Sequence, residues 1–179
     1  PSLIAPTEQA TAYPQPAADS GAVQILSPGP QSKVVSPLKL RTYVIPGFDG
    51  KARIELFGED DRLLVREIVY LPTGLKWAYY YQAIPFEVHA AAELGRLTVS
   101  TQDEYGRTVA LGSVNVLLLS EGVEQINPPG NLKEHCVLTK PPSGGSVTGG
   151  VVHVEGLIRP FNKDYPLVIE LVTRDGGVL

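Results

Sequence analysis

The residues of this 179-residue chain that could carry chemistry are one cysteine and three histidines. Cys136 could serve as a nucleophile, a metal ligand or a lipid attachment site, because each role uses the thiolate. His89, His135 and His153 show no short metal-binding spacing. The chain also lacks the G-x-S-x-G, Walker and H-E-x-x-H motifs. We therefore expect no catalytic residue, no metal site and no cofactor, and the chain is predicted not to be an enzyme.

Two short acidic groups offer further candidate chemistry, Glu59-Asp60-Asp61 and Asp103-Glu104. They could act as paired carboxylates or bind calcium weakly, since hard cations take several oxygen ligands. Both groups lie where hairpin turns are expected, and aspartate stabilises turns by accepting hydrogen bonds from nearby backbone. The turn interpretation is favoured. Structural turn residues are predicted at Pro28, Gly50, Asp60 and Gly106.

Three aromatic residues, Trp77, Tyr79 and Tyr81, form the candidate binding face. They alternate along one predicted strand, so all three point to the same side of it. Amphipathic rings are favoured at interfaces, so this face would bind a protein partner or stack on a sugar. The alternative is that Trp77 fills the core and the tyrosines form cross-strand pairs.

Composition limits the kinds of partner. With 15 Lys and Arg against 19 Asp and Glu, the net charge of −4 gives no basic surface for a phosphate backbone, so nucleic acid is not expected. The longest apolar run, 114–119, contains Asn115 and is far shorter than the ~20 residues that a membrane span requires. A single cysteine allows no disulfide within the chain. Glycine and proline cluster between short apolar runs, which is typical of an all-β protein.

The elements that would position these residues are short strands with alternating apolar side chains. Over 22–119 the alternation and the turn signals between apolar runs predict an antiparallel immunoglobulin-like sandwich. Ala90-Ala-Ala-Glu-Leu94 favours a single helical turn between the two sheets. The strands are expected at 22–27, 36–45, 51–58, 62–70, 76–88, 95–101 and 108–119.

The chain also contains an internal repeat. Ile54-Glu55-Leu56 returns as Ile169-Glu170-Leu171, and Leu38 and Leu40 correspond to Val152 and Val154 after a one-residue slip. A spacing of 113 to 115 residues indicates two tandem copies of one domain. The predicted organisation is an extended Pro/Ala/Thr-rich tether at 1–21, a first sandwich at 22–120, a linker at 121–132 and the first half of a second sandwich at 133–179.

The repeat generates two further expectations. Cys136 occupies the position of Val23, an inward strand residue, so we predict a buried and unreactive free thiol. The counterparts of 65–119 would follow Leu179, and a half sandwich leaves strand edges unpaired. We therefore expect either that the natural protein continues or that a partner chain covers the open edge by adding a strand.

Several motifs together resemble the immunoglobulin-like domain of bacterial spore-germination and sporulation proteins, which also occurs in other exported bacterial proteins. The resemblance implies tandem immunoglobulin-like sandwiches, no catalytic residues and an interaction or spacer role outside the cytoplasm. The motifs are Ile25-Leu-Ser-Pro28, Val35-Ser-Pro-Leu-Lys-Leu40, Phe48-Asp-Gly-Lys-Ala-Arg-Ile-Glu-Leu56, Pro85-Phe-Glu-Val88 and Gly95-Arg-Leu-Thr-Val99.

The leading hypothesis is a non-enzymatic binding or scaffolding module of an exported bacterial protein, secreted or anchored at the cell surface. Its expected partner is a protein of a membrane complex or of the cell envelope, and membrane association would require an N-terminal anchor that precedes Pro1. One alternative is an accessory subunit docked on a membrane-bound complex at the cell exterior. Another is a carbohydrate-binding appendage that uses Tyr79 and Tyr81 to bind a glycan.

Overall fold

The computed structural model describes residues 20–71, 76–133, 136–142, 145–158, 168–173, 175 and 177–179. This part of the chain is all-β, and its only helix is the short 3-10 turn η1 (Glu59–Asp61). Nearly all of the predicted tether, 1–19, lies outside the described residues. The strands are β1 (Val23–Ser27), β2 (Lys33–Val35), β3 (Leu38–Val44), β4 (Lys51–Phe57), β5 (Leu63–Tyr70), β6 (Ala78–Ile84), β7 (Ala92–Gln102), β8 (Thr108–Leu119), β9 (Cys136–Lys140) and β10 (Glu155–Ile158).

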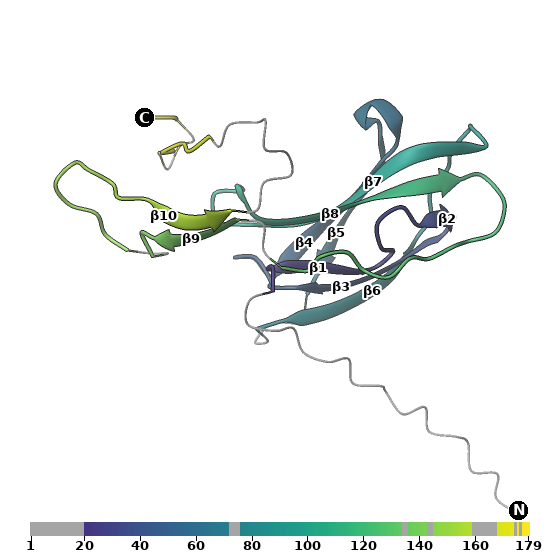
Figure 1. Ribbon diagram of the computed structural model, residues 1–179, viewed down its shortest axis with the longest axis horizontal. Coiled ribbons are helices and arrows are strands. Elements are labelled where there is room, and N and C mark those ends of the chain that lie inside the picture. Colours follow the sequence, from purple (N-terminus) through teal and green to yellow (C-terminus); the bar gives the residue numbers. More distant parts are fainter. Residues whose placement is uncertain are drawn as a thin grey trace, which may run out of the picture.

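The first copy is a sandwich of two sheets (Figure 1). One has the order β1-β3-β6 and the other the order β2-β8-β7-β4-β5. All neighbouring strands are antiparallel except β2 and β8, which are parallel. The short strand β2 was not predicted, because three residues show no periodicity and their pairing partner lies at 117–119.

The predicted helical turn at 90–94 is wrong. Ala92, Glu93 and Leu94 belong to β7 and pair with Leu119, Leu118 and Leu117 of β8. Backbone pairing with a distant strand therefore outweighs the local helix preference of Ala, Glu and Leu.

The core lies between the inner faces of the two sheets, where alternate residues are apolar as predicted. Each large side chain that is fully buried contributes about 1.5–3 kcal/mol relative to an exposed one. The residues of this core that are fully buried, or nearly so, include Val34, Leu38, Leu40, Val44, Ile54, Leu56, Ile84, Leu97, Val99, Val116 and Leu118.

The second hairpin, β9 with β10, repeats the pairing of β1 with β3. Adding 113 to the residue numbers of β1 and 114 to those of β3 converts the four pairs of the first hairpin into the four pairs of the second, and the register shift falls at the same place. The one-residue slip in the sequence repeat is therefore present in the structure. The first-copy pairs are Val23 with Val44, Gln24 with Tyr43, Ile25 with Thr42 and Ser27 with Arg41, and the second-copy pairs are Cys136 with Ile158, Val137 with Leu157, Leu138 with Gly156 and Lys140 with Glu155.

The two copies differ sharply in burial. Core residues of the first copy have exposed apolar counterparts in the second, because β9 and β10 form the only described sheet of that copy. A two-stranded sheet alone has nothing to pack against its apolar face. The buried residues are Ile25, Val34, Leu38, Leu40, Ile54 and Leu56, and their exposed counterparts are Leu138, Val147, Val152, Val154, Ile169 and Leu171.

A matched pair of substitutions tests this difference. Leu56 is 0% exposed and its counterpart Leu171 is 53% exposed. Leu56→Ala should lower the free energy of unfolding by about 2–5 kcal/mol, because it leaves a cavity in the core. Leu171→Ala should change it by less than about 0.5 kcal/mol. Urea unfolding followed by circular dichroism measures both, and equal losses would show that Leu171 is packed as tightly as Leu56.

Candidate functional site

The candidate aromatic residues belong to β6 and the residue before it. Tyr79 and Tyr81 lie on the outer face of the three-stranded sheet, whereas Ala78 and Ile84 enter the core. Tyr81 is 52% exposed. Trp77 is only 8% exposed and lies outside the main core cluster, so it is not presented to solvent with the tyrosines.

Tyr43 of β3 lies on the same side of the sheet but is only 5% exposed, and sequence reasoning missed its contact with the tyrosines. It pairs across the strands with Tyr79, and the two ring centroids are 5.4 Å apart in an edge-to-face arrangement. Such aromatic pairs add about 0.5–1.5 kcal/mol beyond their buried area. The signal was present, because Leu38, Leu40, Thr42 and Val44 alternate inward and leave Tyr43 on the outer side.

Two cations of β3 border the tyrosines. Arg41 pairs across the strands with Tyr81, and its side chain has no ion-pair partner among the described residues. Lys39 lies 3.5 Å from the Glu124 carboxylate of the predicted linker. We call Arg41, Tyr79 and Tyr81 the tyrosine face. It offers flat rings, phenol hydroxyls and a guanidinium, which suits a protein surface that carries carboxylates.

On the opposite side of β6, a chain of polar contacts joins the two sheets. The Tyr80 hydroxyl donates a hydrogen bond to the Gln82 side chain, and the Gln82 amide donates to the Glu67 carboxylate of β5. Burial raises the pKa of Tyr80, and the nearby Glu67 carboxylate raises it further. These partly buried groups satisfy one another, which indicates a structural role.

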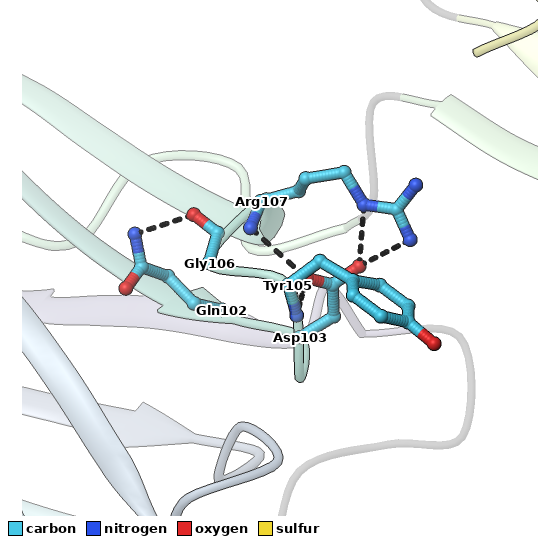
Figure 2. A network of polar contacts seen from close by, with 5 residues as sticks. All are labelled: Gln102, Asp103, Tyr105, Gly106 and Arg107. Atoms are coloured by element: carbon cyan, nitrogen blue, oxygen red, sulfur yellow. Dashed lines mark hydrogen bonds and ion pairs between the residues drawn. The ribbon is translucent and has the colours of Figure 1, made fainter. Parts of the chain in front are cut away.

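The predicted turn at Asp103 is a closed network of hydrogen bonds between β7 and β8 (Figure 2). Asp103 Oδ1 accepts from the backbone N–H groups of Tyr105 and Arg107, each at 2.9 Å, and Oδ2 accepts from Arg107 Nε at 2.7 Å. The Arg107 guanidinium lies 4.9 Å from the centroid of the Tyr105 ring. Gly106 has a φ of +76°, which a glycine adopts without strain. All the contacts of Asp103 here stabilise the turn.

The other predicted turn residues also lie in turns or loops. Gly50 has a φ of +69° between β3 and β4, Asp60 has a φ of +56° within η1, and Pro28 directly follows β1. Within the described ranges, no group of three or more His, Cys, Asp and Glu side chains could hold a metal ion. His89 and His153 are exposed, and His135 lies outside the described residues.

The predicted burial of Cys136 is wrong, because the thiol is exposed. Its counterpart Val23 is only partly exposed, since it packs against the core and lies close to Gly112 of β8. No described strand of the second copy takes the place of β8 beside Cys136. Correspondence in the repeat therefore predicted the strand position correctly but not the packing around it.

Comparison of the chain with protein-family models, with curated proteins and with solved structures gave no match in any of the three. Among the described residues no helix is long and apolar enough to cross a membrane. Functional inference therefore depends on the residues of the fold and on their geometry.

Exposure of Cys136 predicts fast chemical labelling. The folded protein should react with a thiol reagent about as fast in buffer as in denaturant, because no packing protects an exposed thiol. Absorbance of the released leaving group measures the rate. A large acceleration in denaturant would show that the thiol is protected in solution, as the repeat alone had indicated.

The Asp103 network predicts a depressed carboxyl pKa. Burial raises the pKa of Asp103, but hydrogen bonds from Arg107 and the loop backbone outweigh it, so the pKa lies below the usual 3.8. The stability that this carboxylate contributes is present above pH 3.8 and is lost as the pH falls through the lower pKa of the folded state.

NMR titration of the carboxyl carbon measures this pKa directly. Arg107→Gln should raise the pKa of Asp103 toward 3.8, whereas Arg96→Gln, which removes a different exposed ion pair with Asp61, should leave it unchanged. An unshifted pKa in the Arg107 variant would contradict the assigned role of the guanidinium.

Proposed function

We propose that this chain is a non-enzymatic binding and scaffolding module of an exported bacterial protein, which acts outside the cytoplasm on a protein of the cell envelope. We also propose that its sandwich is immunoglobulin-like. The strand orders support this, since β1, β3 and β6 occupy the places of strands A, B and E, while β4, β7 and β8 occupy those of C, F and G.

The observation that carries the proposal is the attachment of the predicted linker to the first copy. Gln125 and Lys33 exchange two backbone hydrogen bonds, each of 2.9 Å. The Asn127 backbone donates to Ser32 Oγ at 2.9 Å, and its side-chain amide donates to the Pro30 carbonyl oxygen at 2.9 Å. These bonds hold the linker along the loop between β1 and β2, so the chain leaves the first copy in a defined direction.

Two further contacts extend this attachment. A Cβ on Gly29 would collide with the carbonyl of Pro128, so only glycine permits the observed approach of linker and loop. Ser20 forms an antiparallel bridge with Lys133, beside the hydrogen bond that the Gly21 N–H donates to the Leu132 carbonyl. A connector held at several points suits a module that spaces and orients its neighbours.

The tyrosine face is the surface that we assign to the protein partner. It lies on the outer side of the three-stranded sheet, and the ion pair between Lys39 and Glu124 joins the linker to the same side. A partner bound there would contact both the sandwich and the linker. Tyr and Arg are enriched among the residues that dominate binding energy at interfaces.

Site-specific crosslinking tests this role. A photo-crosslinking amino acid in place of Tyr81 should give one discrete adduct with an envelope protein in cells, because position 81 is exposed on the tyrosine face. The matched control is the same amino acid in place of Leu94, which is exposed on the other sheet. Adducts of equal yield at both positions, or none at 81, would contradict the proposal.

A further inference from the structure

A second surface, on the opposite sheet, has the features of a ligand site. β4 and β7 pair from Phe57 with Arg96 as far as Arg53 with Ser100. Beyond that pair the strands separate around a depression of about 160 Å³. The Phe48 N–H closes its far end by donating to the Gln102 carbonyl at 3.0 Å. The depression is lined by Asp49, Lys51, Ala52, Arg53, Ile68, Ser100, Thr101 and Gln102.

The depression contains a guanidinium that the described residues leave without an ion pair. The nearest carboxylate along the same face of β4, that of Glu55, lies 2.7 Å from Arg66 on β5. Arg53 therefore remains available to an incoming anion, and a guanidinium binds a carboxylate through two parallel hydrogen bonds. Lys51 stands two residues away, held 2.8 Å from Asp49 and 5.5 Å from the centroid of the Tyr70 ring. The two cations outnumber the single carboxylate of the lining.

The rest of the lining is mixed, since Ser100, Thr101 and Gln102 are polar whereas Ala52 and the exposed Ile68 are apolar. Ser100, which pairs with Arg53, contributes a polar side chain on the outer face, and the Gln102 amide donates to the Gly106 carbonyl at 2.9 Å, which leaves its Oε1 as an acceptor (Figure 2). Tyr70, which pairs across the strands with Lys51, flanks the depression with a side chain that is 76% exposed. A shallow floor with polar side chains beside a flat ring fits a ligand with both hydroxyl groups and an apolar ring face.

We propose that this depression binds a carboxylate-bearing sugar unit of an acidic polysaccharide. The carboxylate contacts Arg53, with Lys51 beside it, while the sugar ring packs against Tyr70 and its hydroxyl groups bond to the floor. A polyacidic peptide fits less well, because it has no flat ring face to pack against Tyr70. This site is independent of the protein-binding role proposed for the tyrosine face, since the two lie on different sheets.

Titration of the isotopically labelled protein with oligogalacturonate, followed by NMR and calorimetry, tests the site. Backbone signals of Lys51, Arg53, Ser100 and Gln102 should shift, whereas neutral cello-oligosaccharides of equal length should shift none of them. Arg53→Gln should weaken binding at least about tenfold, the loss expected for a charge-assisted hydrogen bond. Tyr70→Ala should weaken it as well.

Matched controls use the other sheet. Arg41→Gln removes an arginine that has no ion pair in the described structure, and Tyr81→Ala removes an exposed tyrosine of the same sheet. Both should leave the affinity for oligogalacturonate within about twofold. Circular dichroism confirms that each variant is folded. No binding of oligogalacturonate, equal weakening by Arg53→Gln and Arg41→Gln, or tighter binding of poly-glutamate at the same residues would each overturn the proposal.

Discussion

The first copy depends on one contact, the packing of two sheets through side chains that alternate inward. Leu38, Leu40 and Val44 of β3 face Ile54 and Leu56 of β4 and the apolar residues of β7 and β8 in one continuous cluster. This packing also determines which side chains of the first copy point toward solvent. Burial of one side of each strand sends the other side outward, which places Arg41 and Tyr81 on the outer side of one sheet and Arg53 and Tyr70 on the outer side of the other.

The second hairpin shows what remains without a facing sheet. Its strands keep the register of the first copy, because backbone hydrogen bonds and turn positions determine pairing locally. Its apolar residues stay exposed, because burial requires strands that are distant in the sequence. Pairing and burial are thus separate properties of the repeated sequence. The two strands of the hairpin can pair by themselves, whereas burial requires a second sheet.

Local signals in the sequence predicted most of the first copy. Turn residues such as Gly50 and Asp103, together with period-two alternation, placed seven strands and the outward direction of Tyr79 and Tyr81. The two failures in strand assignment involve pairing between distant residues. β2 is too short to show a period, and Ala92–Leu94 favours helix until β8 lies beside it.

The depression beside Arg53 could not be predicted either, because it depends on where two paired strands separate. No sequence pattern marks that point. Cys136 illustrates the same limit, because its position in a strand was predicted correctly and its burial was not. Residue spacing predicts the face of the strand to which a side chain points. Its exposure depends on which other elements pack against that face, and spacing does not predict those elements.

The bridge between Ser20 and Lys133 has a mechanical consequence. The chain enters the first copy and leaves it at adjacent points, so tension along the polypeptide passes across this bridge before it reaches the sandwich. Such a load would peel the hydrogen bonds of the linker apart one after another, rather than shear the strands of the core. The linker would then lengthen while the two sheets of the first copy carry little of the applied force and stay folded.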